Sequence, residues 1–511
     1  MFSAIASSLN NLFTVEALIG LIIGVVGGMV IGALPGLSAT MGIALLIPAT
    51  YGMDPTAAIL MLAAIYTSAV YGGSISAILI HTPGTPSSAA TCLDGYPMTQ
   101  KGEALHAIGL STTSSVIGGV ISAIALLLIA PPLARVSLKF SSPEYFLIAI
   151  FGLTLIASLS SGSMIKGLLA GAIGLVAGLI GFSPDGYARY TFKIPALLGG
   201  VSLIPAMIGL FSISQVMIQS EERGLNTTTV KEVAELKGRF LPPWKEFKGL
   251  IPLIGECSLV GVLIGILPGA GGDIASWVGL NLAKNSSKHP EKFGTGIPEG
   301  IAAPESANNA VTGGALIPLL TLGIPGSSTA SVLLGGLTIH GLQPGYQLFS
   351  EFADITYAVI LGFLAANILM GLVGWAAGKY LVNVSKVPIP LLLPCITVFS
   401  VLGSYAASQN INDVYVAIVF GMIGYLMRKY GVPVAPVVLA LILGPMADSH
   451  LFMGILQANG QPMLQYMFSR PICIGIFALI ILALFAPLIS KFISEKFQSK
   501  FGKVGEAAED V

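Results

Sequence analysis

Charged residues are scarce in this sequence. Asp, Glu, Lys and Arg make up 9% of its 511 residues, against roughly 25% in soluble domains. The 24 basic and 24 acidic residues cancel, so no excess of positive charge indicates a nucleic-acid surface or a polybasic lipid anchor. Because 54% of the residues are hydrophobic and helices satisfy their own backbone in lipid, we predict an all-α polytopic protein whose partner is the lipid bilayer.

Residues that carry catalytic or metal chemistry are also few. The four cysteines are dispersed without paired spacing, which argues against a disulfide framework or a zinc site. The five histidines show no metal-binding spacing, and the glycine-rich stretch Gly269 to Gly272 lacks the Lys-Ser/Thr of a phosphate-binding loop. We therefore predict no enzyme activity, no cofactor and no ATP hydrolysis, so that an ion gradient would supply the energy for any work.

Proline and glycine, in contrast, are abundant and interrupt the apolar runs. Ala17 to Leu34 is long enough to span a bilayer and stops at Pro35-Gly36, where a helix must end. The next apolar piece, Met41 to Ile47, is about seven residues long and too short to cross as a helix. It predicts a half-helix or re-entrant element. Thr56 to Ile80 is a further span, interrupted at His81-Thr-Pro-Gly84.

The interruptions of the first half recur in the second half in the same order. Gly265-Ile-Leu-Pro-Gly269 repeats the motif Gly32-Ala-Leu-Pro-Gly36, and Gly323-Ile-Pro-Gly326 repeats the motif that ends at Gly84. Two motif pairs at nearly constant spacing indicate an internal repeat. We predict roughly a dozen membrane elements, arranged as a first repeat (1–218), a polar linker (219–248), a second repeat (249–450), and a final helix with a charged tail (451–511).

The most polar membrane-length stretch runs from Pro304 to Gly336. At helical pitch Glu305, Asn308, Asn309 and Thr312 share one face. Ionisable residues at membrane depth cost roughly 3 kcal/mol each, so they normally face a cavity, a partner or a substrate path. This face predicts an ion site. The alternative is that Glu305 lies at the headgroup boundary and the two amides form interhelical hydrogen bonds.

Paired broken helices indicate a secondary transporter whose site lies where the breaks meet near mid-membrane. Helix N-termini attract anions, so the residues after the second break of each repeat predict a carboxylate site: Gly84, Thr85, Pro86, Ser87, Ser88, Gly326, Ser327, Ser328 and Thr329. Unwound backbone, amides and carboxylates supply the oxygen ligands of a coupling ion, sodium or a proton. The predicted cation-binding residues are Gly36, Ser38, Gly269, Asp273, Glu305, Asn308 and Asn309.

The chain resembles the TctA family, the large membrane subunit of tripartite tricarboxylate transporters. The resemblance covers nearly the full length and rests on ALPGLSATMGIALLIPATYG, YGGSISAILIHTPGTPSSAATCLDGYPM, ILPGAGG, PESANNAVTGGALIPLLTLGIPGSS and HGLQPG. It implies a multi-pass permease of the bacterial inner membrane that imports carboxylates such as citrate by sodium or proton symport. It also implies a small four-helix membrane subunit and a periplasmic solute-binding protein as partners. Kinship with dicarboxylate carriers implies inverted repeats and an elevator-type movement.

Other functions stay open at this point. A stand-alone organic-anion carrier or a channel would need no binding protein, and flux coupled to an ion gradient would separate a carrier from a channel. An intramembrane enzyme should carry a compact set of catalytic acids or histidines at one membrane face, whereas this sequence spreads them thinly. The identity of the carboxylate, the coupling ion, the membrane orientation and the oligomeric state, a homo-oligomer included, are not fixed by the sequence.

Overall fold

The computed structural model describes residues 2–34, 36–159, 164–225, 240–269, 271–384, 387 and 389–482. Pro35, part of the predicted polar linker (226–239) and the predicted charged tail lie outside the described residues. The final helix predicted within 451–511 is described as far as residue 482, over Pro471–Leu482.

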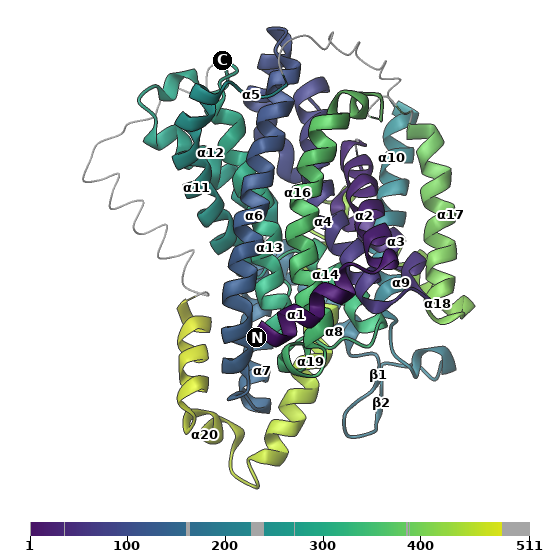
Figure 1. The fold of residues 1–511 in the computed structure, drawn as a ribbon. Helices are drawn as coiled ribbons and strands as arrows, with labels where there is room; N and C mark the ends of the chain where they lie inside the picture. Colours follow the sequence, from purple (N-terminus) through teal and green to yellow (C-terminus); the bar gives the residue numbers. More distant parts are fainter. Residues whose placement is uncertain are drawn as a thin grey trace, which may run out of the picture.

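The described chain is almost entirely helical (Figure 1). The first half contains α1 (Phe2–Leu12), α2 (Val15–Ala33), α3 (Ala39–Leu46), η1 (Pro48–Thr50), α4 (Pro55–Ile80), η2 (Pro86–Ser88), α5 (Ala89–Gln100), α6 (Ala104–Ser137), α7 (Ser142–Leu159), α8 (Met164–Gly178), β1 (Gly181–Phe182), β2 (Ala188–Arg189), η3 (Pro195–Leu197), α9 (Leu203–Met207), η4 (Ile208–Ile213) and α10 (Ser214–Leu225). The second half contains α11 (Trp244–Ile266), α12 (Gly271–Ser286), η5 (Pro290–Lys292), α13 (Glu299–Leu322), α14 (Ser328–Ile339), α15 (Tyr346–Ser350), α16 (Ala353–Val384), α17 (Ile389–Ser408), α18 (Ile411–Lys429), α19 (Ala435–Gln457) and α20 (Met463–Phe468).

Nine helices in the described ranges are long and apolar enough to cross a membrane. Among them, α6 has 34 residues, which at 1.5 Å per residue gives a length of about 50 Å. It runs through nearly the full height of the molecule (Figure 1). The protein is therefore an all-α polytopic membrane protein in its architecture, with short helices filling the spaces between the long ones.

Closely packed helix pairs form the central bundle. Helix α2 packs on α4, and α11 packs on α13. The contacts are tight because glycines of α2 and α11 face backbone: a Cβ on Gly28 would lie 2.8 Å from the carbonyl oxygen of Ile65, and one on Gly265 would lie 2.6 Å from that of Val311. Such backbone approach is typical of helix pairs packed in membranes. Long helices α6 and α16 complete this bundle.

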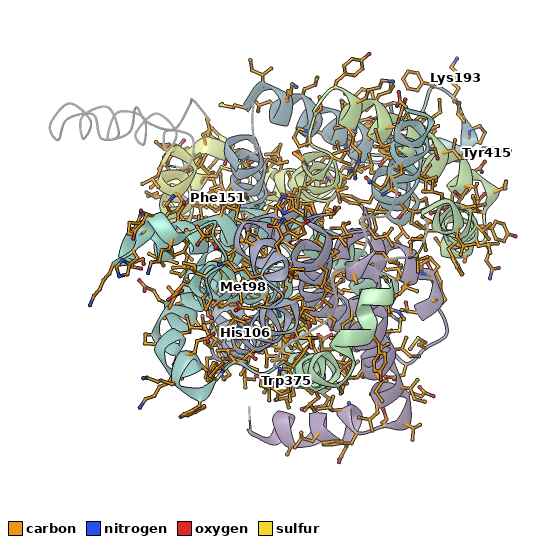
Figure 2. The ribbon with its side chains drawn as sticks, turned by 90° about the horizontal axis from the view of Figure 1, so that it is seen from above. Met98, His106, Phe151, Lys193, Trp375 and Tyr415 are labelled. Carbon is orange, nitrogen blue, oxygen red and sulfur yellow. The ribbon has the colours of Figure 1, made fainter. Side chains whose placement is uncertain are left out.

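Two groups of helices flank the central bundle, and each combines elements from both halves of the chain. Helix α19 packs against α7 and α8, whereas η4 and α10 pack against α17 and α18. Figure 1 shows α10, α17 and α18 together at one side of the molecule. Seen from above, Met98 and His106 lie among the central helices, while Lys193 and Tyr415 lie at the edge (Figure 2). The two halves of the chain are thus interleaved.

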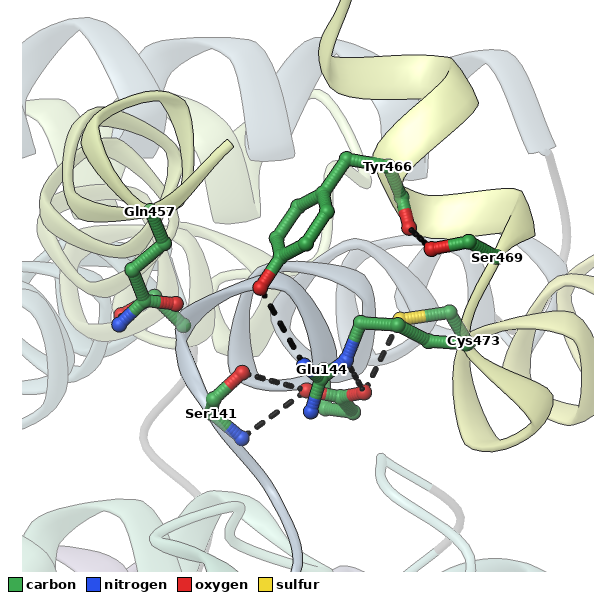
Figure 3. A network of polar contacts seen from close by, with 8 residues as sticks. Ser141, Glu144, Gln457, Tyr466, Ser469 and Cys473 are labelled. Carbon is green, nitrogen blue, oxygen red and sulfur yellow. Dashed lines mark hydrogen bonds and ion pairs between the residues drawn. The ribbon is translucent and has the colours of Figure 1, made fainter. Parts of the chain in front are cut away.

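A polar network joins α7 to the last described helices. Glu144 accepts hydrogen bonds from the backbone N–H and the hydroxyl of Ser141 and from the thiol of Cys473, at 2.9, 3.0 and 3.2 Å (Figure 3). It also forms a 2.5 Å ion pair with Arg470. The Glu144 side chain is fully buried, and a buried charge is stable only when it is paired. This network fixes the C-terminal helices on α7.

The segment between residues 181 and 225 is not a series of uninterrupted membrane helices. The apolar segment 196–218 is not one α-helix, because η3 opens the segment and η4 is a π-helix. Helix α10 continues to Leu225, within the segment predicted as a polar linker, and Gln219 donates a 3.1 Å hydrogen bond to the carbonyl oxygen of Gly36. An antiparallel pair, β1 with β2, interrupts the helical fold and projects at its lower edge (Figure 1).

Candidate functional site

A cavity of about 520 Å³ lies where the interrupted helices meet. Five helical segments begin on its wall, namely α3, η2, α12, α14 and α19, and a residue in the first turn of each lines the cavity. Their first N–H groups have no partner within the helix, and their dipoles place partial positive charge at these ends. The cavity volume lies in the range typical of small-molecule sites, roughly 300–1,000 Å³.

The first two helix starts are set by small polar residues. Ser38 caps α3 by accepting a 3.2 Å hydrogen bond from the N–H of Met41. Thr85 and Ser88 cap each other at the start of η2, where the N–H of Thr85 donates to the Ser88 hydroxyl at 3.4 Å and that hydroxyl donates to the Thr85 carbonyl at 2.8 Å. Gly84, just before this turn, packs directly against Gly32 and Gly73. A side chain at Gly84 would collide with that backbone.

The second half of the chain has the same kind of serine cap and closely packed glycine. Ser327 caps α14 by accepting a 3.1 Å hydrogen bond from the N–H of Ala330. Gly326 packs against the backbone of Gly265, and its carbonyl oxygen accepts a 3.0 Å hydrogen bond from the N–H of Gly269. The break after α11 and the break after α13 are therefore in direct contact.

Hydrogen bonds also join the halves of the chain beside the cavity. The hydroxyls of Thr40 and Thr329 lie 2.8 Å apart, and those of Tyr66 and Ser327 lie 2.7 Å apart. All four residues are buried and line the cavity. The start of α14 is thus bonded to both α3 and α4 through side chains, which places the two sets of broken helices around one space.

Most of the predicted carboxylate-site residues line this cavity. They are Gly84, Thr85, Pro86, Ser87, Ser327, Ser328 and Thr329. Ser88 and Gly326 do not line it. The Ser88 hydroxyl is hydrogen-bonded to the backbone of Thr85, and Gly326 is covered by the backbone of α11 and α13.

The predicted cation-binding residues separate into two environments. Gly36, Ser38, Gly269, Asp273 and Asn308 line the cavity. Asn308 is 1% exposed, and neither polar atom of its side chain has a hydrogen-bond partner among the described residues. Buried polar groups without partners are rare in folded proteins. Asn308 therefore offers one acceptor and two donors to whatever enters the cavity.

Glu305 and Asn309 do not line the cavity, whereas Asn308 and Thr312 of the same helix do. The Glu305 carboxylate is 1% exposed and accepts four hydroxyl hydrogen bonds of 2.5–3.0 Å from Ser74, Thr91, Ser111 and Ser115. These donors come from α4, α5 and α6. The carboxylate is enclosed between helices and does not reach the cavity.

Asn309 belongs to the same buried region as Glu305. Its amide donates to the hydroxyl of Thr67 at 3.1 Å, to the carbonyl oxygen of Ser115 at 3.1 Å and to the side-chain oxygen of Asn367 at 3.3 Å. Thr67 donates to the same Asn367 oxygen at 2.7 Å. These bonds tie α13 to α4, α6 and α16, which is an interhelical role of the kind the sequence left open as an alternative.

Arg428, which was not among the predicted site residues, lines the cavity from the last turn of α18. Its Nε donates to the Ser214 hydroxyl at 3.2 Å and its Nη1 to the Gln215 side-chain oxygen at 3.0 Å. Gln215 itself lines the cavity. A basic residue at the end of an apolar run is typical of a membrane boundary, so sequence alone gave no signal for this position.

The charges on the cavity wall are few. Among the described residues that line the cavity, Arg428 and Asp273 carry the formal charges. The Asp273 side chain lies in the first turn of α12 and is accessible to solvent. One carboxylate, one guanidinium and five helix N-termini together give a wall that favours anions, and Asp273 and Asn308 offer oxygen atoms to a small cation.

In the ranges that the structure describes, no group of three His, Cys, Asp or Glu side chains could hold a metal ion. The oxygen atoms at the helix breaks, in contrast, are of the kind that coordinates sodium in transporters with discontinuous helices.

A polytopic helical protein whose interrupted helices meet at a polar cavity has the architecture of a secondary transporter. The sequence model of the tripartite tricarboxylate transporter TctA family matches residues 18–439 of the chain. The chain belongs to this family, as the sequence motifs predicted, and is thus a tricarboxylate transporter component.

Two relatives from Agrobacterium vitis are similar to this chain. An uncharacterized 52.8 kDa protein in the TAR-I ttuC' 3' region is 34% identical over 477 residues, which cover 92% of this chain and 93% of the relative. An uncharacterized protein in the TAR-II ttuC' 3' region is 34% identical over 235 residues, which cover 45% of this chain and 96% of the relative. No solved structure matches the chain.

Proposed function

We propose that the protein is the permease subunit of a binding-protein-dependent secondary transporter that imports tricarboxylates or related carboxylates by sodium or proton symport. One observation carries this proposal: five helices begin on the wall of a single cavity that contains the partnerless amide of Asn308. Helix N-termini bind carboxylates without buried lysine or arginine. Membership of the TctA family supports the chemical class of the solute.

The proposed coupling ion binds beside the solute. Asp273 places a negative charge on the same wall as the helix N-termini, and that charge repels a carboxylate unless a cation neutralises it. A sodium ion at Asp273 and Asn308, with backbone oxygens of Gly36 and Gly269 and the hydroxyl of Ser38 nearby, would remove this repulsion. Binding of the ion would then favour binding of the solute, which is the thermodynamic requirement of symport.

The proposed movement is of the elevator type, between two inverted repeats. The support is local: Gly84 packs on Gly32 as Gly326 packs on Gly265, and α10 and α19 each pack with helices from the other half of the chain. The central bundle with the helix breaks would carry the solute, and the flanking groups would serve as the scaffold. A small membrane subunit, a periplasmic binding protein and an inner-membrane location complete the proposal, as expected for this family.

The test is uptake of labelled citrate into proteoliposomes that contain the chain and its small membrane partner, with and without the binding protein, under an imposed sodium or proton gradient. We expect uptake that needs the binding protein and one of the two gradients. Uptake that ignores both would indicate a channel and would reject the proposal. Succinate and tartrate are assayed in parallel, because the binding protein is expected to select the solute.

A further inference from the structure

Arg428 lines the cavity from α18, a helix of a flanking group, and not from one of the helix breaks. Its two hydrogen bonds, to Ser214 and Gln215, have uncharged acceptors. Among the described residues no carboxylate lies within ion-pair distance of its guanidinium. The guanidinium has five N–H donors, so most of them are available to a ligand.

The local structure fixes the position of this guanidinium. Helix α18 packs against η4 through glycines: a Cβ on Gly424 would lie 2.9 Å from the Cβ of Ser214 and 3.0 Å from the carbonyl oxygen of Leu210. The Ser214 hydroxyl donates in turn to the Leu210 carbonyl. The π-helix that precedes Ser214 shifts the register of the segment, a feature that occurs frequently at functional sites.

We propose that Arg428 is a specificity-determining residue that binds a second carboxylate of the solute, while the helix N-termini and Asn308 bind the first. This inference rests on the proposed transport of carboxylates. Arginine suits the role because its planar group forms two parallel hydrogen bonds to a carboxylate. A solute with a single carboxylate leaves the guanidinium without its ligand, so the cavity selects solutes with at least two carboxylates.

The geometry also assigns Gln215 as a positioning residue. Its side-chain oxygen accepts from Nη1 of Arg428 at 3.0 Å and so orients the guanidinium toward the cavity that both residues line. Because Arg428 belongs to a flanking group and Asn308 to the central bundle, a solute bound by both connects the two parts of the molecule. Release of the Arg428 contact would accompany their relative movement.

The test measures binding of succinate and of butyrate, a monocarboxylate of the same chain length, to the full-length protein by calorimetry. Wild-type protein should bind succinate more tightly. In Arg428→Gln succinate affinity should fall about ten- to a hundredfold, the range for a hydrogen bond to a charged group, and butyrate affinity should change little. Arg428→Lys should recover part of the succinate affinity, because it keeps the charge and loses the bidentate geometry.

Lys429→Gln is the matched control. It removes the same charge one position along, from an exposed side chain that pairs with Glu221 at 2.6 Å and does not line the cavity. It should leave both affinities at their wild-type values. Butyrate binding by Arg428→Gln reports that the site is folded.

Two results would overturn the inference while leaving carboxylate transport intact. One is an unchanged ratio of succinate to butyrate affinity in Arg428→Gln. The other is an equal loss of affinity for both ligands, which would show general electrostatic attraction instead of contact with a second carboxylate. Wild-type protein that binds neither citrate, succinate nor butyrate would instead reject the proposed function, and the inference with it.

Discussion

Asn308 and Asn309 are neighbours in the sequence with opposite surroundings. Asn308 lines the cavity without a protein partner among the described residues, whereas Asn309 makes three hydrogen bonds to Thr67, Ser115 and Asn367. Their replacement by alanine should therefore affect different properties. The pair allows the binding role of α13 to be separated from its structural role by substitutions that are chemically identical.

For Asn308→Ala we expect ion-dependent citrate uptake to fall about tenfold or more, the effect of one lost hydrogen bond to a charged group, with little change in thermal midpoint. For Asn309→Ala we expect a loss of about 1–3 kcal/mol of stability, because partner groups remain buried and unpaired. Uptake assays and thermal unfolding in detergent measure both. If both variants lost stability equally and Asn308→Ala transported normally, the assignment of Asn308 would be wrong.

Glu305 accepts hydrogen bonds from four buried hydroxyls, and its substitution tests how much these bonds contribute to stability. In Glu305→Gln one oxygen, which accepts two hydroxyl hydrogen bonds, becomes an amide that donates, so the four hydroxyls of Ser74, Thr91, Ser111 and Ser115 can no longer all donate to it. We expect a loss of about 1–3 kcal/mol of stability. Glu351→Gln, an exposed glutamate after α15, should change the thermal midpoint little. A stable Glu305→Gln variant with altered ion dependence would indicate an ion site here instead.

The sequence predicts which positions of α13 are polar, but it does not predict the direction in which each side chain points. The polar residues of α13 were identified from their helical spacing, but spacing does not determine which neighbour each side chain meets. Glu305 and Asn309 turn toward hydroxyls of α4, α5 and α6, while Asn308 turns toward the cavity. Arg428 was missed because its partners, Ser214 and Gln215, lie more than 200 positions away in the sequence.

At the scale of helices, close packing between α2 and α4 depends on single glycines. Gly27 and Gly28 are adjacent on α2, and a Cβ at Gly27 meets nothing within 4 Å, whereas one at Gly28 would lie 2.8 Å from the carbonyl oxygen and 2.9 Å from the Cα of Ile65. The two positions differ in surroundings and share the same helix. They form a matched pair for testing how close the two backbones lie.

Gly28→Ala should destabilise the protein by about 1–3 kcal/mol, the usual effect of forcing an extra methyl group into a packed interface. Gly27→Ala should be neutral or stabilising by up to about 1 kcal/mol, because alanine favours the helix. Thermal unfolding of the two variants in the same detergent measures the difference. Equal midpoints would contradict the packing described for α2 and α4.

Helix interruptions were the most predictable elements. Proline and glycine end helices for local steric reasons, and α3 (Ala39–Leu46) and α14 (Ser328–Ile339) begin just after the predicted breaks. The π-helix η4 was not predictable, since its residues are apolar and its register depends on glycine contacts with α18. The hairpin β1–β2 has only four paired residues, too few to produce an alternating pattern.

For the whole molecule, the described helices present a largely apolar outer surface. Helix α17 is the least buried of the candidate spans, with 22% of its most apolar window buried, and Phe399 near its middle is 61% exposed. In a multi-pass membrane protein such a surface contacts lipid or another apolar chain. A charge at this position should therefore be strongly unfavourable.

Phe399→Lys should lower the amount of correctly inserted protein, because a lysine at the centre of a membrane helix costs about 3 kcal/mol. Tyr430→Lys, at the exposed end of α18 where its side chain is 70% exposed, should insert normally, since a lysine near a helix end reaches the interface. Quantitative fractionation of membranes measures both. Equal yields of the two variants would show that α17 does not face an apolar environment.

The interleaving of the two halves could not be derived from the sequence. The internal motif repeat indicated which segments correspond, but the packing of α19 on α7 and α8, and of α10 on α17 and α18, depends on contacts between distant parts of the chain. It is this arrangement that brings α18, with Arg428, to the same cavity as the helix breaks.

Binding of carboxylates in this cavity should protect a cysteine on the cavity wall from chemical labelling. Ser328→Cys, at a partly exposed lining position, is introduced into a chain whose four native cysteines are replaced, and its reaction with a hydrophilic maleimide is followed in membrane vesicles. Ser220→Cys, exposed on α10 outside the cavity wall, is the control. We predict that citrate with sodium slows labelling at position 328 and not at position 220. Equal labelling with and without citrate, succinate or tartrate, under sodium and proton conditions alike, would show that carboxylates do not bind in this cavity.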